Sequence, residues 1–86
     1  MHTVQLLSKA ITVAQGAGYQ IREETLEGAG GGHCLIRGQK WLLLDLTQSH
    51  QEQLNDVLDA LRCELDLPWD SLPQALVVHL KLPKAA

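Results

Sequence analysis

The first part of the chain places its apolar residues with a helical period. From Thr3 to Ala17 they recur every three or four positions and form one wide stripe. We therefore predict a helix over this range, with Thr3 as its N-cap and with Gly16 and Gly18 at its end. The stripe is rich in small residues, which suits close packing on a sheet. It consists of Val4, Leu6, Leu7, Ala10, Ile11, Val13, Ala14 and Ala17.

After this helix the period of the pattern falls to two. Residues 19–26 alternate as an amphipathic strand would, and the glycine-rich stretch from Glu27 to His33 predicts a mobile loop or hairpin tip. Residues 34–37 are extended again, Gly38-Gln39 fits a two-residue turn, and residues 40–46 return as a further strand. These segments together predict a three-stranded antiparallel meander.

The strand over residues 40–46 is apolar on both of its faces. Trp41 and Leu43 point to one side, and Leu42, Leu44 and Leu46 point to the other. A strand with two apolar faces is typical of the centre of a sheet. We expect the helices to cover one face, which leaves the other face for a second layer or for another subunit.

A second helix follows this strand. Ser49 and Glu52 form a capping-box pattern at its start. The apolar positions that follow the helical period are Leu54, Val57, Leu58, Leu61 and Leu65. The positions expected to face water are Gln51, Asn55, Asp56, Asp59 and Arg62.

The C-terminal part of the chain leaves two alternatives open. Residues 67–70 break the second helix, and residues 71–82 fit either a strand or a short helix from Leu72 to about Leu80 with Pro73 in its first turn. We favour the helix, because Asp70 or Ser71 is able to cap it, and we expect residues 83–86 to be a frayed tail. The predicted fold is thus one two-layer α+β domain over residues 1–86: a helix, a three-stranded antiparallel meander, a helix and a short C-terminal helix.

Composition and charge narrow the function classes. The net charge is −3 and the seven Lys and Arg residues are scattered, so the chain lacks the basic stripe that nucleic acids require. No apolar run is long enough to span a membrane, and the N-terminus lacks the order of a signal peptide, so we expect a cytoplasmic protein. In that compartment Cys34 and Cys63 are expected to be reduced, buried thiols, although the sequence leaves their pairing open.

The glycine-rich loop is the first candidate for chemistry. Free backbone amides at Gly30, Gly31 and Gly32, with His33 beside them, are candidates for binding an anion. A Walker-type loop, however, needs Lys-Ser or Lys-Thr and opens a helix, whereas here His33 and Cys34 lead into a strand. Neighbouring side chains in a strand point to opposite faces, so these two do not form a catalytic pair. We expect Cys34 in the core and His33 in solvent.

A metal site is the second candidate. The residue types suit zinc, but no pair has the spacing of a C-x-x-C or H-x-x-x-H motif. We therefore predict no metal, no other cofactor and no catalytic residue. The residues considered are His2, His33, Cys34, His50, Cys63 and His79.

Three consecutive segments carry a resemblance to known proteins. They are Gly32 to Ile36, which reads G-x-C-x-h, Gly38 to Asp45, an apolar strand that starts after a glycine and ends in aspartate, and Glu52 to Leu61, which reads E-x-L-x-x-h-L-x-A-L. These segments are similar to a small family of uncharacterised bacterial proteins. They also resemble, more distantly, the strand and active helix at the core of minimal zincin metallopeptidases.

The zincin motif itself is missing. A zincin carries H-E-x-x-H on its active helix, and the matching positions here read Leu58-Asp59-Ala60-Leu61-Arg62. Because these side chains cannot hold zinc or activate a metal-bound water, no functional residue carries over. The resemblance implies a catalytically empty scaffold that is kept for structural or binding work.

The sequence therefore favours a small non-enzymatic binding or interaction module. The two apolar faces of residues 40–46 favour self-association, or association with another protein, over a small-molecule reaction. The alternative from a different class is a small metal-dependent hydrolase, built from residues that the spacing rules do not bring together.

Overall fold

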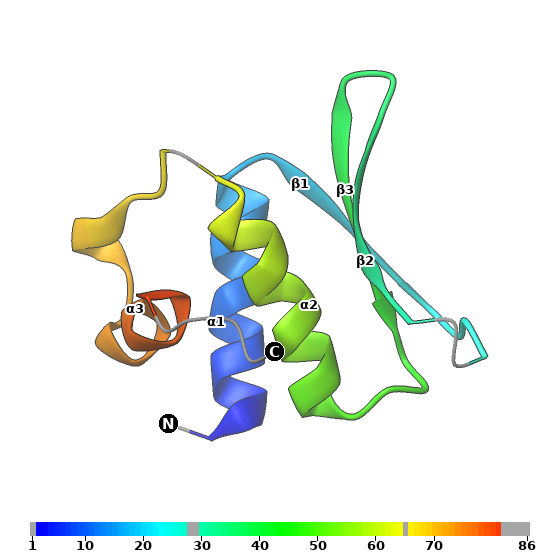
Figure 1. Ribbon diagram of the computed structural model, residues 1–86, viewed down its shortest axis with the longest axis horizontal. Coiled ribbons are helices and arrows are strands. Elements are labelled where there is room, and N and C mark those ends of the chain that lie inside the picture. Colours follow the sequence, from blue (N-terminus) through cyan, green and yellow to red (C-terminus); the bar gives the residue numbers. More distant parts are fainter. Residues whose placement is uncertain (1, 28–29, 65, 82–86) are drawn as a thin grey trace.

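The computed structural model describes residues 2–27, 30–64 and 66–81 of the chain (Figure 1). The α+β class is confirmed, and the helix favoured over the strand is present at Gln74–Lys81, two residues later than predicted; the predicted tail at 83–86 lies outside the described residues. None of the described helices is long and apolar enough to cross a membrane. The elements are α1 (Thr3–Gly16), β1 (Tyr19–Glu24), β2 (Gly32–Ile36), β3 (Gln39–Asp45), α2 (His50–Arg62), the 3-10 helix η1 (Trp69–Ser71) and α3 (Gln74–Lys81).

The sheet is mixed, and the predicted antiparallel meander is wrong. The strand order is β1-β3-β2, with β3 parallel to β1 and antiparallel to β2. The prediction that β3 is central is confirmed: the most apolar strand takes the position where both edges are paired. The connection after β1 therefore passes beyond β3 to reach the far edge, and it does not form a hairpin tip.

The hairpin between β2 and β3 turns one residue earlier than predicted. Its two central residues are Arg37 and Gly38, with φ values of 51° and 80°. Positive φ at both positions is the signature of a type I′ turn, which matches the twist of the flanking strands. Gln39 consequently starts β3 instead of closing the turn.

The helices lie on one face of the sheet, and α3 lies on the far side of the α1–α2 pair (Figure 1). Leu42 and Leu44 of β3 point toward this pair and are buried, as are the inward positions of α1 and α2. Trp41 and Leu43 point to the opposite side of the sheet, here called the outer face, and are half-buried. No described helix covers the outer face.

Local signals at the helix starts are only partly those predicted. His2, not Thr3, is the N-cap of α1, and its backbone N–H donates to Gln5 Oε1 at 3.2 Å. The capping box of α2 is confirmed. Ser49 Oγ accepts from the backbone N–H of Glu52 at 3.1 Å, and Glu52 Oε1 accepts from the backbone N–H of Ser49 at 3.1 Å.

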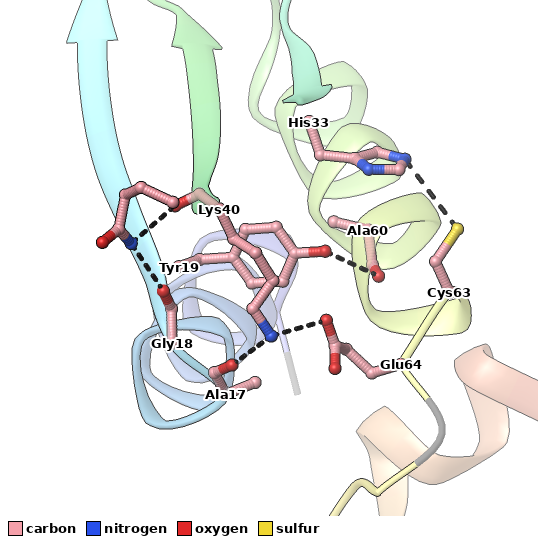
Figure 2. A network of polar contacts seen from close by, with 9 residues as sticks. Ala17, Gly18, Tyr19, His33, Lys40, Ala60, Cys63 and Glu64 are labelled. Carbon is pink, nitrogen blue, oxygen red and sulfur yellow. Dashed lines mark hydrogen bonds and ion pairs between the residues drawn. The ribbon is translucent and has the colours of Figure 1, made fainter. Parts of the chain in front are cut away.

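A polar cluster joins the ends of both long helices to the sheet (Figure 2). The Lys40 ammonium donates to the Ala17 carbonyl after α1 and pairs with Glu64 Oε1 after α2, at 2.9 Å. It also lies 5.0 Å from the centre of the Tyr19 ring. Burial, and then the Glu64 carboxylate, raise the pKa of Tyr19, whose hydroxyl donates to the Ala60 carbonyl at 3.5 Å. These contacts supply side-chain donors to carbonyls at the C-terminal ends of both helices, and the Ala60 carbonyl also accepts from the backbone N–H of Cys63 at 3.1 Å.

Candidate functional site

Asp45, at the end of β3, is completely buried and holds the loop that follows β1. Its carboxylate accepts hydrogen bonds from the backbone N–H groups of Leu26 and Gly30, both at 3.1 Å. The backbone N–H of Thr47 donates at 2.9 Å and its hydroxyl at 2.6 Å. The Thr47 hydroxyl first, and then the three backbone amides, lower the pKa of Asp45 to about 2 against the cost of desolvation. The ionised carboxylate thereby takes the place of water as the hydrogen-bond acceptor for backbone N–H groups of the loop.

The glycines of this loop serve close packing. The Gly30 amide, one of the candidate anion donors, is directed at Asp45. A Cβ atom added to Gly31 would lie 2.2 Å from the Leu43 carbonyl oxygen, so the backbone approaches β3 more closely than any side chain allows. Gly31 and Gly32 line a cavity together with His33, whereas Gly30 stands outside it.

This cavity, here called the His33–Cys63 pocket, lies between the start of β2 and the last turns of α2. Its volume is about 480 Å³. The pocket combines a thiol, an imidazole, two carboxylates and a guanidinium within one concave surface. Its lining residues are Gly31, Gly32, His33, Asp56, Asp59, Arg62 and Cys63.

His33 and Cys63 meet although thirty residues separate them. His33 is paired with Leu42 in the sheet, so its side chain lies on the helix side, where its Nε2 is 3.9 Å from Cys63 Sγ (Figure 2). Cys34 is paired with Trp41 and points to the outer face. Both cysteines are free and exposed, which contradicts the predicted burial of the thiols and of Cys34 in the core. The predicted separation of His33 from Cys34 onto opposite faces is consistent with this register.

The acidic side of α2 is less exposed than its pattern predicts. Asp56 and Asp59 are half-buried, and Asp56 Oδ2 is buried without a described donor in good hydrogen-bond geometry, although the Gly31 amide lies close to the carboxyl group. Burial, and then the negative charge of Asp59, raise the pKa of Asp56, and the Gly31 amide offsets part of this effect. Arg62 pairs with Asp59 at 3.1 Å and donates to the His79 carbonyl of α3 at 3.0 Å.

The other metal-ligating types stay dispersed. Within the described ranges no group of three or more His, Cys, Asp or Glu side chains is arranged to hold a metal ion. His2 caps α1, His50 begins α2 and His79 belongs to α3. At the positions that match the zincin motif, Leu58 and Leu61 are buried in the core.

A second hollow, of about 440 Å³, lies between α1 and the end of β3. Its wall is mixed: of the described residues that line it, five are aliphatic, among them Val4, Leu7, Ile11 and Leu46, and six are polar. The polar residues are Ser8, Thr12, Glu23, Gln48, His50 and Gln53. The Thr12 hydroxyl donates to the Ser8 carbonyl within α1 at 3.1 Å, and no hydrogen bond in the described part of the chain joins Ser8 or Thr12 to Glu23 or His50.

The two edges of the sheet differ in charge. The β1 edge carries Arg22, Glu23 and Glu24, and Arg22 pairs with Glu24 at 2.6 Å. The β2 edge, residues Gly32–Ile36, carries no Lys, Arg, Asp or Glu, and its aliphatic residues are open to solvent, with Leu35 68% and Ile36 52% exposed. Among the described strands β2 pairs with β3 alone, so one side of its backbone is free.

These features define a small α+β protein with a helix-covered sheet face, an uncovered outer face and one uncharged free edge. Comparisons with family models, curated proteins and solved structures give no match. The resemblance to the zincin core stays a prediction. Sequence patterns missed the His33–Cys63 contact because no local motif joins the two residues, whereas a buried role for Asp45 had a signal: an acidic residue directly after four apolar ones.

Proposed function

We propose that the protein is a non-enzymatic interaction module that assembles with a second copy of itself through the β2 edge. The observation that carries the proposal is that β2 has one unpaired backbone edge, carries no Lys, Arg, Asp or Glu side chain and is open to solvent. In monomeric proteins, charged residues, proline or β-bulges usually protect the edge strands of a sheet from pairing with another chain. The β1 edge has such charges, and the β2 edge has none.

A second copy suits this edge because antiparallel pairing of identical strands is self-complementary about a two-fold axis. Pairing centred on Cys34 would set Arg37 of one copy opposite Gly31 of the other. Arg37 would then approach the acidic residues of the partner's His33–Cys63 pocket, Asp56 and Asp59. Opposite charges would flank the axis while the uncharged strands meet at its centre.

The outer face supports the same assembly. Trp41 and Leu43 of β3 are half-buried there, and Ile36 of β2 extends the apolar surface toward the free edge. A sheet continued through the two-fold axis would join the outer faces of both copies into one apolar surface. Near the axis, Cys34 and Ile36 of the two copies would lie side by side on this surface, while Trp41 and Leu43 of β3 would remain on its open part.

We place this assembly in the cytoplasm, where free thiols such as Cys34 and Cys63 stay reduced. The alternative of a metal-dependent hydrolase has no supporting ligand cluster among the residues that the structure describes. We therefore do not advance it.

Sedimentation velocity over a concentration series tests the assembly. The parent protein is expected to form a dimer as its concentration rises. Cys34→Glu, at an exposed site, should weaken the dimer by about tenfold or more, because two carboxylates would face each other near the axis.

The matched control is Gln20→Glu, which places the same charge on the same cross-strand row but on the β1 edge. This variant should dimerise as the parent does. A parent protein that stays a compact monomer at the highest concentration would refute the proposal. Equal weakening by both substitutions would show that net charge, and not the β2 edge, controls association.

A further inference from the structure

We propose that Cys63 is a site of reversible thiolation by low-molecular-weight disulfides that carry an amino group, with His33 as the proton acceptor. This goes beyond self-association and concerns the monomer, because in the proposed dimer the partner's Arg37 would approach Asp56 and Asp59; the kinetics are therefore measured at a concentration where the chain is monomeric. The juxtaposition that carries it is a thiol–imidazole pair set beside two carboxylates in one cavity.

The geometry of the pair favours reaction at Cys63 over Cys34. The thiolate is the reacting form of cysteine, and a base within contact distance of the sulfur provides a route for its proton. His33 Nε2 lies 3.9 Å from Cys63 Sγ, and the thiol is open to solvent. Cys34 is also open to solvent but lies on the outer face, away from this imidazole. Cys34 therefore serves as a reference thiol in the same chain, with which the reactivity of Cys63 can be compared.

The pocket next to the sulfur has the size and polarity for an aminothiol. Its volume of about 480 Å³ falls within the range of small-molecule sites. Asp56 Oδ2 is buried in its wall, and the Gly31 amide acts on this carboxyl group without reaching good hydrogen-bond geometry to Oδ2; a buried acceptor paired so incompletely is costly. An ammonium group on the incoming disulfide would supply the missing donor and would meet the negative charge of Asp59.

The exchange is balanced without any further oxidant. The Cys63 thiol gives its proton to His33 Nε2, and the thiolate attacks one sulfur of the disulfide. A new S–S bond forms to Cys63 while the original S–S bond breaks, and the departing thiolate takes the proton back from His33. One disulfide replaces another, and a thiol of low molecular weight reverses the reaction.

The surrounding charges select the reagent. Asp59, Arg62 and Glu64 stand on or next to the last turn of α2, and Asp56 lies one turn earlier. Asp59 pairs with Arg62 and Glu64 pairs with Lys40, so the carboxylate of Asp56 leaves the pocket with one net negative charge. A cationic disulfide is therefore favoured over a neutral or anionic one.

The test compares cystamine, which is cationic, with 2-hydroxyethyl disulfide, which is neutral, by intact-mass kinetics. In a Cys34→Ser background only Cys63 reacts, and in a Cys63→Ser background only Cys34 reacts. The ratio of cystamine rate to hydroxyethyl disulfide rate at Cys34 supplies the intrinsic difference between the reagents. At Cys63 this ratio should be about fivefold larger, as one partly exposed ion pair allows.

Three substitutions assign the effect to residues. In the Cys34→Ser background, His33→Gln should slow both reagents at Cys63, whereas His50→Gln, at the opposite end of α2, should slow neither. Asp56→Asn should remove the preference for cystamine and keep the dependence on His33. Equal reagent ratios at the two cysteines would overturn the proposed amine site, and an unchanged Cys63 rate in His33→Gln would overturn the proposed role of the imidazole. Far-UV circular dichroism checks that each variant is folded.

Discussion

At the scale of single residues, Asp45 shows how one carboxylate organises a loop without binding anything external. Hydrogen bonds from Leu26, Gly30 and Thr47 satisfy it inside the protein. Its cost of burial is met because the ionised form accepts four hydrogen bonds from described residues, the two from Thr47 among them. The backbone N–H of Gly30, which the sequence suggested as a donor to a bound anion, therefore donates to Asp45 instead.

Asp45 also predicts how stability depends on pH. Its pKa is about 2 in the folded protein against an ordinary value of 3.8, so folding favours the ionised form. The stabilisation is fully present above the unfolded value and is lost as the pH falls through the folded value. Between about pH 4 and pH 2 the melting temperature of the parent should therefore fall more steeply than that of Asp45→Asn.

At neutral pH the Asp45→Asn variant itself should melt at a lower temperature, because an amide cannot accept all four hydrogen bonds. Asp70→Asn, in the exposed 3-10 helix, is the matched control and should retain the parent's pH profile in this window. Melting curves by circular dichroism provide the measurement. Parallel pH profiles for the parent and Asp45→Asn would contradict the role assigned to the buried carboxylate.

At the scale of elements, the connection from β1 to β2 determines the topology. It crosses the end of β3 so that β2 joins the opposite edge, and Gly31 passes against the Leu43 carbonyl on the way. Glycine-rich composition alone indicated a loop but not its path. The close approach exists because the loop is anchored to Asp45 on one side and continues into β2 on the other.

Replacing Gly31 tests this path. Gly31→Ala should destabilise the protein by about 1–3 kcal/mol, because the new methyl group overlaps the Leu43 carbonyl and forces the backbone to shift. Gly16→Ala is the control: nothing lies within 4 Å of its added Cβ, and alanine in a helix stabilises by up to about 1 kcal/mol relative to glycine. Urea denaturation measures both. A neutral Gly31→Ala would mean that the loop does not lie against β3.

At the scale of the whole molecule, the sheet has one protected side and one open side. The α1–α2 pair buries Leu42 and Leu44, and α3 covers that pair from behind (Figure 1). The β2–β3 hairpin extends past the helices, which leaves Leu35 and Ile36 in solvent. Folding stability therefore arises on the helix side, and the free β2 edge is the surface that the proposed association would use.

Two leucines separate these contributions. Leu42→Ala should reduce the free energy of unfolding by about 2–5 kcal/mol, because Leu42 is fully buried and its loss leaves a cavity. Leu35→Ala should change it by less than about 0.5 kcal/mol, since its side chain is 68% exposed. Both values come from urea denaturation at a protein concentration where the chain is monomeric. Equal losses would contradict the assignment of the core to the helix side.

The sequence by itself determined the types of the elements, most of their inward residues and the Ser49–Glu52 cap, because periodicity and capping act within a few residues along the chain. The central place of β3 followed from its two apolar faces. The order and direction of the strands were decided by the tertiary structure, since pairing depends on the path of a loop that carries no periodic signal. The tertiary structure also determines the His33–Cys63 pocket. The strand register directs the His33 side chain toward the helices, and helix packing places the end of α2 next to it. Neither the register nor the packing can be predicted from the residues adjacent to His33 or Cys63 in the sequence.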